Sequence, residues 1–312
     1  MFTTNESKKL AGVSADEVYF SSYHILGYKG YGRCVNIWGT TAASGNSITL
    51  YDWDNNDDQL WSLKRIGSNS NGEYTFVLES AHSGLYLGYT GVTDNNNIKY
   101  CNVTNQRSKA EIVAESLDVS RDLYRFKMYI DNTAYYLTPW AGVSRNTSKL
   151  LWMPERNNTD QIWKAVSGTT YPAAHSSVRP EWRWPTPESA RINDGYNSIW
   201  REYNTDPTVT NNHVGLDLSA GNGYCYSMFD GTIKEIHTKL SNYRGRYVDV
   251  QSDDGTVVRY QHLASINVSG STVSKGDIIG VIGGSGTSEN TYGVHLHFEI
   301  NNGNTDPLTY FD

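Results

Sequence analysis

Short apolar segments alternate along the whole chain with loops rich in Gly, Asn, Ser and Asp. Within many of these segments apolar and polar residues take turns, which is the period of a β-strand with one buried face. The loops supply the residues that tight antiparallel hairpins require. This pattern predicts an all-β protein.

Composition supports the same fold class. Of the 312 residues, 12% are aromatic and only 19% charged, and Gly (28) and Tyr (23) are abundant. The chain lacks the Leu, Glu and Lys excess of helical bundles, which excludes an all-α or coiled-coil protein. Its length is sufficient for two domains. All nine Trp lie at or before Trp200, so two cores of different character are expected.

A threefold repeat organises the first half of the chain. Gln59-Leu60-Trp61 recurs as Gln161-Ile162-Trp163, 102 positions later (163 minus 61), and a degenerate copy, Ala110-Glu111-Ile112, lies at the midpoint. Two short apolar segments precede each copy: 33–37 and 48–51, 85–88 and 98–101, 135–138 and 150–153. Self-similarity with a fixed period of 51 residues predicts three copies of one structural unit.

These repeats resemble those of the ricin-B-type β-trefoil lectins, over roughly residues 21–166. The resemblance implies a β-trefoil whose Trp61 and Trp163 pack in a shared core, and a role in binding glycan or cell wall. In that family an Asp of each repeat grips the sugar, but the matching positions here are Asn36, Gly88 and Thr138. The glycan-binding residues therefore stay unassigned. An aromatic platform could come from one of four residues: Trp38, Tyr51, Trp53 or Trp140.

Four of the chain's eight prolines fall in residues 167–187, which are predicted to be a linker because proline disfavours helix and favours extended chain. The aromatic cluster at its end, 182–185, is expected to pack on the following domain. The chain is thus divided into an N-terminal segment (1–20), a trefoil (21–166), the linker and a second domain (188–312).

The second domain is predicted to be a compact antiparallel β-sheet. The expected strands cover 231–236, 247–251, 256–262, 275–283 and 294–300. Asp253-Asp254-Gly255 between two of them is a strong hairpin signal. Gly283-Gly284-Ser285-Gly286 lacks the Lys-Ser/Thr and the helix of a phosphate loop, so it is interpreted as a flexible rim of a cleft.

Histidines mark the chemistry of this domain. On an extended strand His295, His297 and Glu299 share one face, while 294, 296, 298 and 300 fill the other. His213 and Asp217 face the same way if the turn at 211–215 leads into a strand. A zinc site needs three N or O ligands and an open position, which His213, Asp217 and one of the terminal pair supply.

His262 is expected on the face of its strand that carries Val258 and Tyr260, from which it could reach the same cleft. Glu299 is interpreted as a supporting or solvated carboxylate rather than a metal ligand.

The order His213-x-x-x-Asp217, Tyr260-x-His262-Leu, His295-x-His297 resembles the lysostaphin-type zinc endopeptidases of bacterial peptidoglycan, over about residues 182–312. The resemblance implies His213, Asp217 and His297 as ligands of Zn²⁺, with His262 and His295 as the catalytic pair. One imidazole moves the proton of the attacking water and the other stabilises the oxyanion; which does which stays open. The loop before His295, residues 286–293, is longer than usual.

The remaining features limit the partners. The net charge of −7 gives no basis for nucleic-acid binding, and no apolar run is long enough to span a bilayer, so no membrane insertion is expected. The N-terminus lacks an apolar signal core, so secretion after signal removal or release by lysis is expected. Cys34, Cys101 and Cys225 are expected to be free and mostly buried.

The sequence therefore predicts a monomeric, secreted or wall-located zinc endopeptidase that cuts peptidoglycan stems or cross-bridges, targeted by a lectin-like trefoil. Two alternatives are retained: a wall-binding or adhesive protein with an inactive peptidase domain, and a peptidase that acts on Gly-rich proteins outside the wall.

Overall fold

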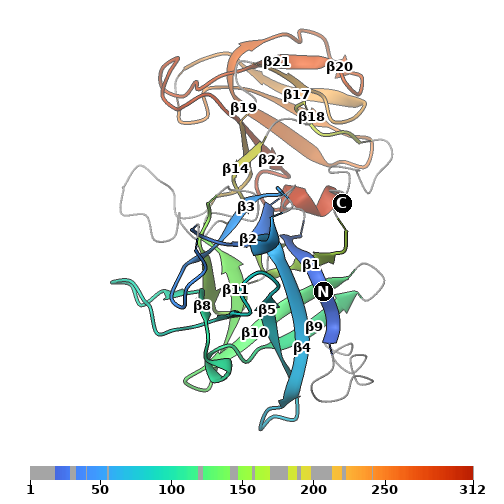
Figure 1. Cartoon of the computed structure of the whole chain (residues 1–312). Helices are drawn as coiled ribbons and strands as arrows, with labels where there is room; N and C mark the ends of the chain where they lie inside the picture. Colours follow the sequence, from blue (N-terminus) through green and yellow to red (C-terminus); the bar gives the residue numbers. More distant parts are fainter. Residues whose placement is uncertain are drawn as a thin grey trace. The chain divides into compact units, whose positions relative to one another are not determined.

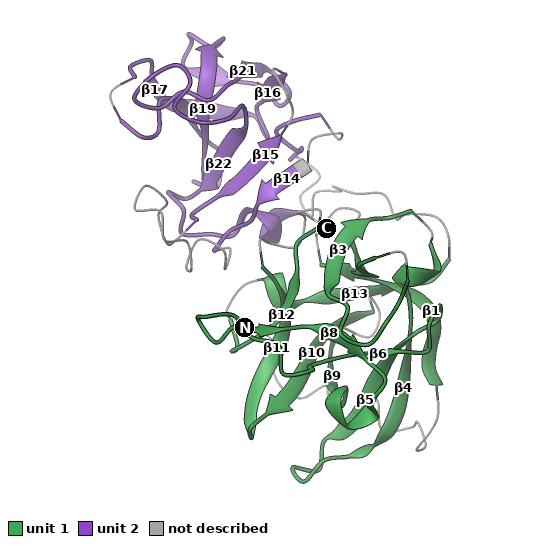
Figure 2. Ribbon diagram, turned by 60° about the vertical axis from the view of Figure 1, so that its left-hand side comes forward, with its two compact units in different colours: residues 1–172 green, residues 173–312 purple. Residues whose placement is uncertain are grey.

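The computed structural model describes residues 18–28, 33–39, 41–54, 56–118, 122–140, 147–156, 159–168, 182–187, 191–197, 213–219, 223–240 and 242–311. Contacts divide the chain into two units, residues 1–172 and 173–312 (Figure 2). Most of the predicted N-terminal segment and linker lies outside the described residues. Among the described residues, no helix is both long and apolar enough to cross a bilayer.

Strands of the first unit form three successive groups (Figure 1). The first group is β1 (Val18–Gly27), β2 (Arg33–Ile37), β3 (Ile48–Asp52) and β4 (Leu60–Ser68). The second is β5 (Tyr74–Ser80), β6 (Tyr86–Gly88), β7 (Lys99–Tyr100), β8 (Asn102–Thr104) and β9 (Val113–Asp118). The third is β10 (Leu123–Ile130), β11 (Thr133–Pro139), β12 (Leu150–Met153) and β13 (Trp163–Val166).

The pairing of these strands closes a ring. β1 pairs with β4 and β13, β4 with β5, and β10 with β9 and β13. A bridge between Phe76 and Ile112 joins β5 to the segment that enters β9. Six of the remaining strands form the hairpin pairs β2–β3, β6–β8 and β11–β12, and β7 pairs with β12. A closed ring with three hairpins is a β-trefoil, which confirms the predicted fold of this unit.

The Gln-x-Trp triplets hold the repeats together by identical contacts. Trp61 and Trp163 are fully buried, and their indole N–H groups donate to the carbonyls of Val35 and Leu137, each 26 residues upstream. Buried Gln59 and Gln161 likewise donate to and accept from the backbone five to seven residues before them. Each triplet therefore satisfies its polar atoms locally while its apolar side chain fills the core.

The second unit is an antiparallel sheet, as the sequence predicts. Its strands are β14 (Arg191–Asp194), β15 (Leu216–Ser219), β16 (Tyr224–Tyr226), β17 (Gly231–His237), β18 (Arg246–Gln251), β19 (Val257–Ile266), β20 (Thr272–Val273), β21 (Ile278–Ile282) and β22 (Leu296–Ile300). The main path runs β14-β15-β22-β19-β18-β17-β20, and β21 pairs with β19 and β16. A short 3₁₀ helix, η5 (Pro307–Tyr310), follows β22.

Two tryptophans secure the entry to this sheet. Trp182 stacks on Tyr310 with ring centroids 4.6 Å apart, and Trp184 meets Phe298 and Phe311 edge to face. Both indoles are buried, so the aromatic cluster packs on the second unit as expected.

The three cysteines give a direct test of this packing. All three are free and buried, and burial raises their pKa values, that of Cys225 to about 12. Because the thiolate is the reactive form, the folded protein is expected to resist Ellman's reagent and to expose three thiols in denaturant. Cys225→Ser should leave two. Stoichiometric labelling of the folded protein would contradict the described cores.

Candidate metal centre

Three neighbouring strands position the predicted site. Asp217 on β15 lies opposite His297 on β22, and His297 lies opposite Gln261 on β19. His213 precedes β15, from which Gly215 separates it. A Cβ atom on Gly215 would come within 2.3 Å of the Phe298 carbonyl oxygen and 2.8 Å of His297 Nε2. Glycine is therefore required for the chain to pass this close to β22.

Three predicted ligands converge. His297 Nδ1 lies 2.7 Å from Asp217 Oδ1, and His213 Nε2 lies 3.1 Å from both of these atoms. All three side chains are buried, and within the described residues they form a group that could hold a metal ion. Two imidazole nitrogens and one carboxylate oxygen are the donor set of catalytic zinc sites, so the residues fit this ion.

Hydrogen bonds behind the ligands orient both imidazoles. His213 Nδ1 lies 2.7 Å from the Gly195 carbonyl oxygen. Because a carbonyl only accepts, Nδ1 carries the proton and Nε2 presents a lone pair to the centre. His297 Nε2 lies 3.3 Å from Glu299 Oε1, which also accepts from Gln261 Nε2. Glu299 therefore lies behind His297 in a supporting position.

The charges of the cluster shift the pKa values strongly. Burial alone would raise the pKa of Asp217, but His213 and His297 hold it well below its usual range. Burial alone would lower the pKa of His297, but the carboxylates of Asp217 and Glu299 raise it to about 9. Without a metal, His297 thus keeps both ring protons at neutral pH.

His262 reaches the cluster through a β-bulge, and its predicted face is wrong. In the pairing of β18 with β19, Arg246 lies opposite Leu263 and Val248 lies opposite Tyr260. β19 therefore carries one extra residue between these two pairs. His262 has φ of +66°, which breaks the alternation. Tyr260 stays in the core, whereas the His262 ring lies 4.8 Å from that of His295 and 5.7 Å from that of His297, centroid to centroid.

Backbone carbonyls fix both predicted catalytic imidazoles. His262 Nδ1 donates to the Ser285 carbonyl (2.9 Å), and His295 Nδ1 donates to the Gly293 carbonyl (2.7 Å). In the neutral form of either ring, Nε2 then carries the lone pair. The Nε2 atom of His295 lies 3.6 Å from Asp217 Oδ1. The pKa of His262 is lowered to about 3, mainly by burial and further by the neighbouring His297 and His295.

Two further expectations are corrected by the structure. Val294 was predicted in the buried face of its strand, but it is 44% exposed because β22 begins only at Leu296. The 283–286 segment is not merely a rim: Ser285 is fully buried, its N–H donates to the His262 carbonyl, and its Oγ accepts from the Arg246 N–H.

Sequence reasoning missed the residues that support the site. Gly195 and Ser285 act through backbone carbonyls, for which the side-chain pattern gives no signal. Tyr292, in the loop that was singled out as long, places its ring 4.6 Å from that of His262 and is 38% exposed. Arg246 and Glu289 tie the same loop to β18 through an ion pair. From the sequence, only the length of this loop indicated a special role for the segment that contains Tyr292.

Comparison with known proteins identifies both units. Residues 211–308, which include all five predicted site residues, match the model of peptidase family M23. The second unit carries a peptidase family M23 domain. Residues 19–108 match the ricin-type beta-trefoil lectin domain-like family. The first unit is thus a ricin-B-like lectin domain, and its trefoil continues through Val166 beyond the matched range.

Two curated relatives are similar to part of the chain. An uncharacterized metalloprotease of Buchnera aphidicola is 30% identical over 120 residues, which is 38% of this chain and 30% of that protein. The peptidoglycan DD-endopeptidase ShyA of Vibrio cholerae is 36% identical over 90 residues, 28% of this chain and 20% of that protein. The chain thus spans less than a third of the length of either relative.

Among solved structures, the catalytic domain of lysostaphin from Staphylococcus simulans is 28% identical. The match covers 38% of this chain and 84% of that domain, with a TM-score of 0.29.

Metal uptake tests the cluster without any substrate. Since His297 must lose a proton before Nδ1 can bind an ion, zinc binding near neutral pH should release about one proton. The affinity should rise about tenfold per pH unit up to about pH 9 and then level off. Calorimetry of chelator-treated protein in buffers of different ionisation enthalpy measures both. Asp217→Asn should abolish uptake, whereas His237→Ala, on β17, should retain it. Uptake without proton release would contradict the arrangement.

Proposed function

We propose that the chain is a zinc-dependent endopeptidase that hydrolyses peptide bonds in the stems or cross-bridges of bacterial peptidoglycan. The observation that carries this proposal is the cluster of His213, Asp217 and His297 with two further imidazoles beside it, inside an M23 domain. The matched region of a peptidoglycan DD-endopeptidase favours wall peptides as the substrate class.

Zinc is the metal that the donor set favours. Imidazole nitrogens with one carboxylate suit this ion, whereas calcium and magnesium prefer oxygen ligands throughout. A bound zinc ion would supply Lewis-acid polarisation of the scissile carbonyl and activation of water.

The neighbouring imidazoles supply proton transfer. With Nδ1 of His262 and His295 held by backbone carbonyls, each Nε2 can accept the proton of attacking water. A ring that has taken up this proton can then donate it through the same atom to the leaving amine or to the developing oxyanion. The two rings lie side by side, so one can act in each capacity. Tyr292 contacts His262 at the exposed edge and would line the approach of the substrate.

The lectin-like unit is proposed to hold the enzyme on the wall. Tethering to a polymer raises the local concentration of cleavable bonds around the second unit without any new contact at the active site. We place the protein's action outside the cytoplasm, at the cell wall, on the same reasoning.

Variants of the histidines separate ligands from catalytic groups. His297→Ala is expected to lose both bound zinc and wall lysis. His262→Ala and His295→Ala should keep zinc but lower kcat by about 10²–10⁴-fold, the usual contribution of a general acid or base. Zinc content by mass spectrometry and turbidity loss of purified walls measure the two properties, with His237→Ala as the control.

Two results would contradict this assignment. If His297→Ala lyses walls as well as the parent, the cluster is not the catalytic centre. If the zinc-loaded parent releases no fragments from walls but cleaves Gly-Gly peptides, the substrate lies outside the wall. Fragment masses from several bacterial walls identify the bond that is cut.

A further inference from the structure

Asn36, Gly88 and Thr138 stand at the positions where a ricin-B-like repeat would bind its sugar, but here they make contacts within the fold. Asn36 Nδ2 donates to the neighbouring Ile37 carbonyl. Thr138 is fully buried, and its hydroxyl donates to the Tyr136 carbonyl and accepts from Gln161 Nε2. Gly88 has no side chain, and a Cβ there would lie 2.3 Å from the Lys109 carbonyl oxygen. None of these three positions can grip a sugar with a side-chain carboxylate.

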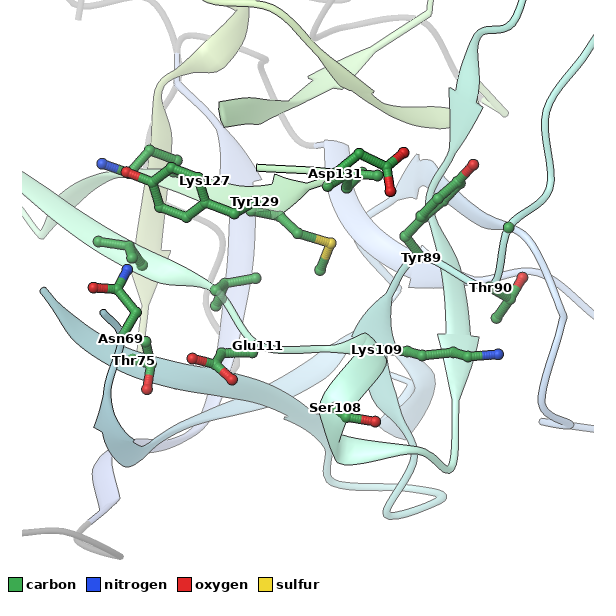
Figure 3. A pocket seen from close by; sticks show the side chains of 15 residues that line it. Asn69, Thr75, Tyr89, Thr90, Ser108, Lys109, Glu111, Lys127, Tyr129 and Asp131 are labelled. Carbon is green, nitrogen blue, oxygen red and sulfur yellow. The ribbon is translucent and has the colours of Figure 1, made fainter. Parts of the chain in front are cut away.

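A different feature of the first unit has the shape of a binding site. A pocket of about 540 Å³ lies where the β4–β5 turn, the entry to β9 and the end of β10 meet (Figure 3). Its lining thus comes from more than one repeat. Figure 3 shows Tyr89 and Asp131 on one side of the pocket and Tyr129, Asn69 and Glu111 on the other.

Glu73 holds one wall in place. Its carboxylate accepts from Asn69 Nδ2, the Tyr129 hydroxyl and Lys127 Nζ at 2.9, 2.9 and 2.6 Å. Burial alone would raise the pKa of Glu73, but these hydrogen bonds lower it, so the carboxylate stays charged near neutral pH. Lys127 is held further by Glu115 at 2.8 Å. The Tyr129 and Asn69 side chains are therefore ordered before any ligand arrives, which reduces the entropy cost of binding.

A tight turn presents the other wall. Asp131 and Asn132 both have positive φ, as the central residues of a two-residue type I′ hairpin between β10 and β11. This fixes the Asp131 carboxylate at the rim. Tyr89 lies on the same side of the pocket as Asp131 (Figure 3). Thr90 adds a hydroxyl beside them.

The floor between the walls is apolar. It is formed by Ile112, Val113, Met128 and Ile130, all at least nine-tenths buried. Two carboxylates that can accept hydrogen bonds from hydroxyl groups, two phenol rings and an apolar floor together suit a ligand with many hydroxyls, one apolar ring face and an apolar branch. The lining carries charges of both signs, Asp131 and Glu111 against Lys109 and Lys127, so it suits a ligand without a large net charge.

We infer that this pocket binds an oligosaccharide bearing acetamido groups, with the acetamido methyl on the apolar floor and the sugar hydroxyls on Asp131 and Glu111. The inference rests on the glycan-binding role proposed for the first unit and is independent of the peptidase activity. The proposed ligand lies between repeats, away from the sugar-binding positions that Asn36, Gly88 and Thr138 occupy.

Calorimetric titration of the full chain with tri-N-acetylchitotriose tests the site, with cellotriose, which lacks acetamido groups, as the comparison ligand. The parent should bind the acetylated trisaccharide saturably and cellotriose at least about tenfold more weakly. Tyr89→Ala and Asp131→Asn should each weaken binding about tenfold or more. Asn suits the left-handed turn position, so Asp131→Asn keeps the hairpin.

Matched controls locate the site. Asn36→Ala, and Trp38→Ala at a 48% exposed aromatic outside the pocket, should leave the affinity unchanged. Thermal unfolding of each variant checks the fold. The inference is overturned if the parent binds neither sugar, if the two sugars bind equally, or if Trp38→Ala abolishes binding while Tyr89→Ala does not. Wall lysis by the same preparations reports the peptidase separately, so the two proposals fail independently.

Discussion

The pairing of Asp217 with His297 across β15 and β22 is the interaction on which the candidate metal centre is built. The strand register brings a carboxylate and an imidazole into direct contact in a buried position, where each would be costly alone. His213 and Glu299 extend this contact into a continuous chain of polar side chains. Because every member is hydrogen-bonded to another or to the backbone, the cluster can be buried, rigid and still open to a cation.

Much of this arrangement could be predicted from the sequence, because period-two alternation assigns faces and the order of the histidines is distinctive. Asp217 and His297 lie on regular strands, so their faces follow from position alone. His262 does not, since a single extra residue in β19 reverses its face and leaves no mark on the side-chain pattern. The carbonyls of Gly195 and Ser285 are equally invisible to a method that reads side chains.

In the first unit the repeat could be recognised in the sequence because equivalent Trp and Gln side chains make the same hydrogen bonds in two of its copies. Trp61 and Trp163 each find a carbonyl 26 residues upstream, and the glutamines before them cap the adjoining turns. The middle copy keeps only its apolar member: Ile112 is buried and bridges to Phe76. The pocket escaped prediction because its walls come from different repeats, and no repeat pattern singles out Glu73, which orders one of them.

The bulge at His262 places the ring beside the cluster by means of a strained backbone conformation. A side chain with a Cβ held at φ of +66° is strained by about 1–3 kcal/mol, and the hydrogen bonds to Ser285 offset part of that strain. Glycine or asparagine would relieve the strain at the same position but would remove the imidazole from the cluster. Either substitution would therefore be expected to relieve strain in the second unit while removing one of the two imidazoles that lie beside the candidate metal centre.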